Sequence, residues 1–228
     1  MNFERRKIDL HVVDALDSTS ARSGRSEALA LRFWLRDTRI SIVSHYAWDQ
    51  AALLDVIKRI SVHRREYIGT RKYLPFLHIA CHGVPDGLLI GDDVPIAWSK
   101  LVEILLPLQK KVDYTLPLTL SSCHGFSGYR VALQELKEFE KRRPYYVLIG
   151  PQGKLSTGEL ILATGELYRS LLSEHVGLPE SIKRANKHIR KPTAHLSYTY
   201  GADVVEKFGK YGVDDKNLFA PRSKRLQG

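Results

Sequence analysis

Short apolar runs and stretches of helical periodicity alternate along most of the chain. Residues 8–16 and 39–47 are apolar runs rich in β-branched residues, and residues 26–37 between them combine helical spacing with strong helix formers. These three stretches predict a strand–helix–strand unit. The alternation continues with strands predicted at 74–83, 116–123 and 144–150, and helices at 48–67, 98–111, 127–142 and 156–174.

Two local signals add detail to this pattern. Residues 87–98 predict a β-hairpin over a turn at 91–93, and Ser156 with Glu159 forms a capping box that begins a long helix. Strands that alternate with helices in this way predict an α/β fold, with a mostly parallel sheet and helices on both of its faces. After about residue 192 the pattern fades, and no element is predicted there.

The length and composition of the chain suit one domain. Its 228 residues, of which 43% are hydrophobic, can bury a sizeable core, with residues 192–228 as an unassigned C-terminal segment. The N-terminus has no apolar stretch long enough for a signal peptide or a membrane span, which predicts a cytoplasmic protein. The two cysteines, Cys81 and Cys123, are therefore expected to remain free thiols in a reducing compartment.

The formal net charge of +10 is most concentrated in residues 181–195. Five Lys and Arg residues occur there without an acidic residue, while apolar residues recur at helical spacing. This pattern predicts an amphipathic surface helix with a solvated basic face, because no recognised nucleic-acid-binding motif accompanies the charge. A nucleic-acid partner is not favoured, and an acidic protein would suit this face equally well. The basic residues are Lys183, Arg184, Lys187, Arg190 and Lys191, and the apolar ones are Ile182, Ala185 and Ile189.

Cysteine and histidine gather where two of the predicted strands end. The stretch HIACHG closes the strand 74–83, and LSSCHG closes the strand 116–123. In open parallel sheets, ligands bind at the carboxyl ends of the strands, and neighbouring strands lie about 5 Å apart. If these two strands are neighbours, His82 and Cys123 can face the same substrate.

Other uses of these residues fit the pattern less well. His78 lies deeper in its strand, where a satisfied core histidine is expected, and Cys81 should face away from His82 and serve as packing. Zinc would need ligands from both faces of one strand, and the compact spacing of structural zinc sites is absent. The segment 150–157 is similar to a phosphate loop, but its glycines are too close together and Leu follows Lys154. No metal or cofactor is therefore expected.

The order and spacing of these elements resemble the caspase-like cysteine peptidases, the group that holds caspases, metacaspases and bacterial CHAT-domain proteins. HIACHG resembles the histidine motif of CHAT proteins and metacaspases, and LSSCHG resembles both the CHAT strand end LSAC and the metacaspase motif DSCHSG. The resemblance covers about residues 8–190. It implies a caspase-like fold in which Cys123 is the nucleophile, His82 is the catalytic histidine, and the backbone N–H groups of Gly83 and Cys123 form the oxyanion hole.

The resemblance implies a cysteine endopeptidase that cleaves a protein substrate, in a bacterial signalling or defence setting. A separate protein partner is expected to control or recruit it, because no regulatory module is recognised in the sequence. The alternative from another functional class is a catalytically inactive scaffold with the same fold. Such a scaffold would bind a protein or a nucleic acid through its basic face.

The substrate residue before the scissile bond is expected to be uncharged or small. Metacaspases carry Asp two residues before the cysteine, and Ser121 occupies that position here. A hydroxyl group can accept a hydrogen bond but cannot neutralise a buried cation. A pocket for a charged residue would therefore need another acid, and the candidates near the His82 loop are Asp86, Asp92 and Asp93.

Overall fold

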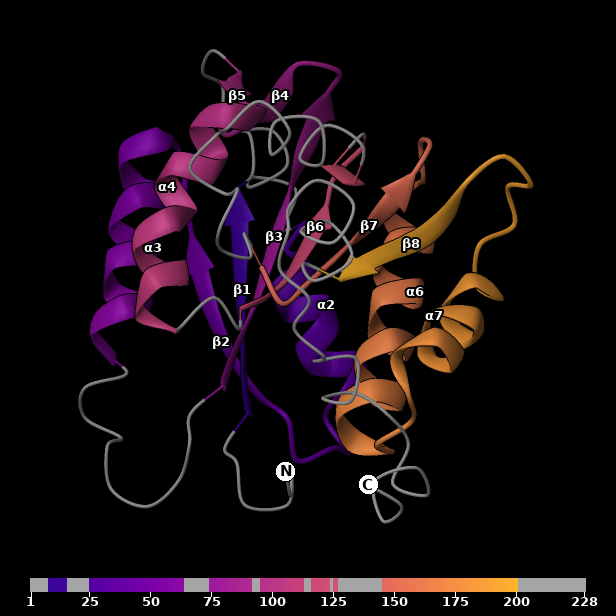
Figure 1. Cartoon of the computed structure of the whole chain (residues 1–228). Coiled ribbons are helices and arrows are strands. Elements are labelled where there is room, and N and C mark those ends of the chain that lie inside the picture. The colour runs from indigo at the N-terminus through magenta and orange to yellow at the C-terminus, as the bar shows by residue number, and fades with distance from the viewer. Residues whose placement is uncertain are drawn as a thin grey trace, which may run out of the picture.

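The centre of the molecule is a mixed β-sheet with the strand order β2-β1-β3-β6-β7-β8 (Figure 1). The computed structural model describes residues 8–15, 25–63, 74–91, 95–112, 116–123, 125–126 and 145–200. The pairs along this path are parallel except for β7 and β8, which are antiparallel. The strands are β1 (Ile8–Ala15), β2 (Ser41–Tyr46), β3 (Leu74–Val84), β4 (Gly87–Leu89), β5 (Ile96–Ala97), β6 (Pro117–Ser121), β7 (Val147–Gln152) and β8 (His195–Tyr200).

Helices cover both faces of the sheet, and each face has its own apolar core (Figure 1). Helices α3 (Gln50–His63) and α4 (Trp98–Lys111) pack on one face, while α2 (Glu27–Trp34), α6 (Thr157–Tyr168) and α7 (Leu178–Asn186) pack on the other. A π-helical turn, Arg169–Ser173, extends α6. The predicted α/β architecture with a mostly parallel sheet is confirmed. Among the described residues, no helix is both long and apolar enough to cross a membrane.

Strand alternation sends the polar residues of the two central strands to one face of the sheet. In β3, Leu77 and Ile79 join the core beneath α3 and α4, whereas His78 contacts Tyr168 of α6. In β6, Leu118 and Leu120 join the same α3–α4 core. Because successive side chains on a strand point to opposite faces, the alternate positions of β3 and β6 face α2 and α6.

Most of the predicted elements match the structure within a few residues. The hairpin is present as the antiparallel pair β4–β5, although Asp92 and Asp93 of its predicted turn at 91–93 lie outside the described residues. The predicted helix at 127–142 also lies outside the described residues.

β8 was not predicted, because its residues do not form an apolar run. Its position is set by antiparallel pairing with β7 and by Asn186 of α7, whose side chain bonds both the N–H and the carbonyl of Leu196, at 2.7 and 3.0 Å.

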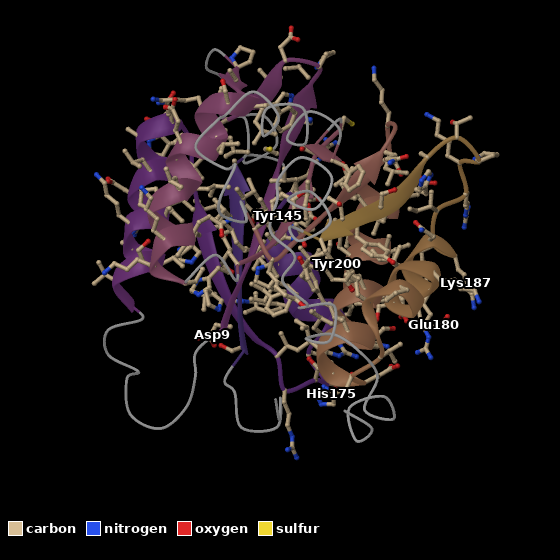
Figure 2. The ribbon with its side chains drawn as sticks, in the orientation of Figure 1. Asp9, Tyr145, His175, Glu180, Lys187 and Tyr200 are labelled. Atoms are coloured by element: carbon tan, nitrogen blue, oxygen red, sulfur yellow. The ribbon has the colours of Figure 1, made fainter. Side chains whose placement is uncertain are left out.

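The predicted basic helix is shorter and less positive than its sequence indicates. α7 ends at Asn186, so Lys187, Arg190 and Lys191 lie beyond its last residue. The basic residues within α7 meet acids from just outside the basic segment, with Arg184 2.8 Å from Glu174 and Lys183 3.7 Å from Glu180. Figure 2 shows Glu180 and Lys187 together at this surface. Part of the basic charge is therefore balanced locally, as is usual for a solvated helix face.

The capping box at the start of α6 is confirmed in full. The Ser156 hydroxyl accepts from the Glu159 N–H at 3.3 Å, and the Glu159 carboxylate accepts from the Ser156 N–H at 3.2 Å and from its hydroxyl at 2.7 Å. The same carboxylate accepts from the backbone N–H of Arg190 at 3.1 Å. The capping box therefore also ties the start of α6 to the chain that follows α7.

We predict that Ser156→Ala lowers the free energy of unfolding by about 1 kcal/mol, the typical cost of losing an N-cap side chain. The Ser156 hydroxyl, followed by the Arg190 N–H, holds the pKa of Glu159 below its ordinary value. A carboxyl group of this kind adds stability above its unfolded-state pKa, and the contribution is lost as the pH falls through the folded-state pKa.

Urea unfolding of the wild type and of Ser156→Ala at several pH values checks this prediction. The difference in stability should narrow as the pH falls through the lowered folded-state pKa of Glu159, because the protonated carboxyl no longer gains from these hydrogen bonds. Ser173→Ala, at an exposed position after α6, serves as the control and should change stability by less than about 0.5 kcal/mol. Equal stability of Ser156→Ala and the wild type at neutral pH would contradict the prediction.

Candidate active site

A cavity of about 320 Å³ lies at the carboxyl ends of β3 and β6. The ends of these two parallel strands form one side of the cavity, and the first turns of α2 and α6 form the other. A site at this edge of the sheet is the general expectation for an open α/β fold. The lining residues are Arg25–Glu27 and Ala30 from the α2 region, Ala80–His82 from β3, Ser121–Cys123 from β6 and the turn after it, and Leu155, Thr157, Leu160 and Ile161 from the α6 region.

The structure brings His82 and Cys123 to this one cavity. Ala80 of β3 is in register with Ser121 of β6, and His82 and Cys123 each follow two residues later. His82 still belongs to β3, whereas Cys123 lies in the turn that follows β6, so the end of one strand and the turn after its neighbour meet at this cavity. His82 is exposed and Cys123 is partly buried, and therefore solvent and substrate can reach both.

Gly83, the residue after His82, lies with its backbone against the backbone of Cys123. A Cβ atom added at Gly83 would lie 1.7 Å from the carbonyl oxygen of Cys123 and 3.0 Å from its amide nitrogen. The approach to the carbonyl oxygen is closer than any contact that a real Cβ atom makes, so only glycine fits at this position without a shift of the backbone. The close approach fixes the end of β3 against the turn that carries Cys123.

Cys81 and His78, which also belong to the HIACHG stretch, have surroundings that differ from those of His82. Cys81 packs against the α3–α4 core on the opposite face of the sheet, although it also borders the cavity. Burial raises the pKa of its thiol well above the ordinary range, which keeps it protonated and weakly nucleophilic. His78 is fully buried, with its Nδ1 atom 2.7 Å from the hydroxyl oxygen of Tyr168.

A buried carboxylate, Glu27, is the main feature of the cavity that was not predicted from the sequence. Its side chain is 8% exposed, and the Ser121 hydroxyl, 2.8 Å from both of its oxygens, donates its single hydrogen to this carboxylate. The His78 Nε2 atom lies 3.2 Å from one of these oxygens, and the Thr164 hydroxyl of α6 lies 3.4 Å from it. In the sequence Glu27 has the pattern of a solvated acid in the first turn of a helix, which is why no signal pointed to it.

Asp14, the next-to-last residue of β1, holds the first turn of α2 in this position. Its carboxylate accepts hydrogen bonds from the Glu27 N–H at 3.0 Å, the Ala28 N–H at 3.3 Å and the Ser26 hydroxyl at 2.5 Å. Burial raises the pKa of Asp14, and these hydrogen bonds oppose the rise. The end of β1 is thus connected to the N-terminus of α2, which directs the side chain of Glu27 toward β6.

Asp86, one of the acids proposed from the sequence for the substrate pocket, is not among the residues that line this cavity. Asp86 is exposed in the turn between β3 and β4, where its carbonyl accepts from the Trp98 N–H at 3.3 Å. Asp92 and Asp93 lie outside the described residues, as does His124. Ser121 does line the cavity, as the sequence indicated, and it does so as the hydrogen-bond partner of Glu27.

No three His, Cys, Asp or Glu side chains of the described ranges form a group that could hold a metal ion. The polar side chains of the cavity include the Cys123 thiol, the His82 imidazole and the buried Glu27 carboxylate. Comparison with known proteins adds no relative to this description, since no protein-family model and no curated protein matches the chain.

We predict that Gly83→Ala lowers the free energy of unfolding by about 2 kcal/mol or more, because the new methyl group forces β3 and the Cys123 turn apart. Gly158→Ala is the matched control. A Cβ atom at Gly158 would meet nothing within 4 Å, and alanine favours the helical conformation by about 0.5–1 kcal/mol. Urea denaturation of both variants measures these effects. If Gly83→Ala were as stable as the wild type, the close approach described above would be wrong.

Proposed function

We propose that this protein is a caspase-like cysteine endopeptidase in which Cys123 is the nucleophile and His82 the general acid and base. The observation that carries the proposal is the placement of both side chains, from neighbouring parallel strands in register, in one cavity at the carboxyl edge of the sheet. The motifs around the two residues resemble those of CHAT proteins and metacaspases, in the same order along the chain. The confirmed α/β architecture with a mostly parallel sheet is compatible with this group.

Acylation of the enzyme is the first half of the proposed reaction. The Cys123 thiol loses its proton to His82, and its sulfur attacks the carbonyl carbon of the scissile peptide bond. The oxyanion that forms accepts hydrogen bonds from the backbone N–H groups of Gly83 and Cys123. When the C–N bond breaks, His82 gives the proton to the departing amine. The acyl part of the substrate then remains on Cys123 as a thioester.

Deacylation repeats these steps with water as the nucleophile. His82 takes a proton from a water molecule, whose oxygen attacks the thioester carbonyl carbon. The C–S bond breaks, the carboxylic acid leaves, and the proton returns to the Cys123 sulfur. Cys81 does not take the role of Cys123, because it packs toward the other face of the sheet and its thiol has a raised pKa.

A role in binding alone, through the basic segment 181–195, has weaker support. Lys183 and Arg184 are already close to the acids Glu180 and Glu174, so part of the positive charge of α7 is used within the molecule. Control by a separate protein partner and a cytoplasmic location remain predictions from the sequence.

We predict that Cys123→Ala abolishes peptide-bond cleavage and that His82→Ala reduces it by about 100-fold or more, the usual contribution of a general acid–base group. Cys81→Ser should keep substantial activity, because its side chain takes no part in the reaction. The measurement is a mass-spectrometric cleavage profile of a proteome-derived peptide library, with circular dichroism to verify that each variant is folded. Undiminished cleavage by folded Cys123→Ala would refute the proposed function.

A further inference from the structure

Building on the proposed peptidase function, we propose that Glu27 makes the substrate pocket selective for Lys or Arg immediately before the scissile bond. The geometry that points to this is the position of a buried carboxylate in the same cavity as Cys123 and His82. The sequence favoured an uncharged or small residue, because Ser121 stands where metacaspases have an acid. In the structure the acid comes from α2, and Ser121 is hydrogen-bonded to it.

Among the described residues, no Lys or Arg forms an ion pair with Glu27, and its nearest polar partners are the Ser121 hydroxyl, which donates to it, and the His78 imidazole. The Thr164 hydroxyl lies 3.4 Å from Glu27 and donates to the Leu160 carbonyl at 2.8 Å. A buried ion without a counter-charge is costly, whereas a cation brought by the substrate would neutralise it. The pocket therefore has an electrostatic requirement that a Lys or Arg side chain meets.

A neutral His78 imidazole does not balance a negative charge on Glu27. The Tyr168 hydroxyl can donate to His78 Nδ1, 2.7 Å away, which leaves the imidazole hydrogen on Nε2, 3.2 Å from Glu27. Burial raises the pKa of Tyr168, so its hydroxyl keeps the proton that this bond requires. In this arrangement the His78 imidazole carries no positive charge that could neutralise the Glu27 carboxylate.

The remaining walls of the cavity suit the stem of a long basic side chain. Ala30, Leu160 and Ile161 provide apolar surface beside the carboxylate, and methylene groups pack well against such surface while the charged head reaches a polar partner. An ionised carboxylate offers about four acceptor positions, so it can bind a substrate guanidinium while it accepts from Ser121. Arg25 also borders the cavity, but it is exposed and forms no ion pair with Glu27.

The decisive experiment compares fluorogenic peptides that differ only in the residue before the cleaved bond: arginine, its neutral isostere citrulline, norleucine or aspartate. The wild type should cleave the arginine peptide with a kcat/KM about 100-fold above that of the citrulline peptide. In Glu27→Gln, which keeps an acceptor for Ser121, this ratio should fall to near one through loss of arginine cleavage. Glu103→Gln, an exposed change on α4 across the sheet, should leave the ratio as in the wild type.

Two further measurements separate failure of this inference from failure of the proposed function. Equal alkylation of Cys123 in the wild type and Glu27→Gln shows that the variant keeps a folded site. Benzamidine, a small amidine cation, should protect Cys123 from alkylation in the wild type and not in Glu27→Gln.

A preference for norleucine or aspartate that Glu27→Gln leaves unchanged would overturn the inference and keep the peptidase function, with aspartate pointing to Arg25. Absence of any Cys123-dependent cleavage would instead remove the proposed function. In that case benzamidine protection alone would test the cation pocket. Protection in the wild type that is lost in Glu27→Gln would support it, and equal protection of the two proteins would overturn it.

Discussion

The contact between the Gly83 backbone and the Cys123 carbonyl is the constraint on which the proposed chemistry depends. Parallel strands in register bring His82 and Cys123 to the same edge of the sheet, but a side chain at position 83 would collide with the Cys123 carbonyl and push the strand end and the turn apart. Gly83 removes that side chain, so the end of β3 lies directly against the turn that carries the thiol. Two reactive groups from distant parts of the sequence thereby share a single cavity.

A polar layer between the sheet and α2 supports this edge and gives it a negative charge. Asp14 binds the first turn of α2, and this turn directs Glu27 onto Ser121 of β6. His78 and Tyr168 complete the layer from β3 and α6. The alternation of side chains along the strands separates the two apolar cores, and it also places the polar residues of β3 and β6 beside the cavity. The contacts that order the cavity therefore also position the Glu27 carboxylate, which is the group proposed to select the substrate residue.

Much of the fold follows from local sequence patterns, whereas the decisive parts of the site depend on contacts between distant residues. Apolar runs and helical spacing predict β1, α2, β3 and α4, because each element buries a face that its own sequence defines. β8 has no such run and depends on pairing with β7 and on the Asn186 side chain. His82 and Cys123 could be predicted because motifs mark them at strand ends. The role of Glu27 could not be predicted, because it is buried against Ser121 and Thr164, which lie 94 and 137 residues away in the chain.

The central claim is that His82 activates the Cys123 thiol, and the alkylation rates of the two cysteines in one molecule test it most directly. Mass spectrometry after timed exposure to iodoacetamide at about pH 7 measures both rates in the same sample. The account predicts that Cys123 reacts at least about tenfold faster than Cys81, and that His82→Ala slows Cys123 while leaving Cys81 unchanged. Equal reactivity of the two thiols, or a Cys123 rate unaffected by His82→Ala, would contradict it.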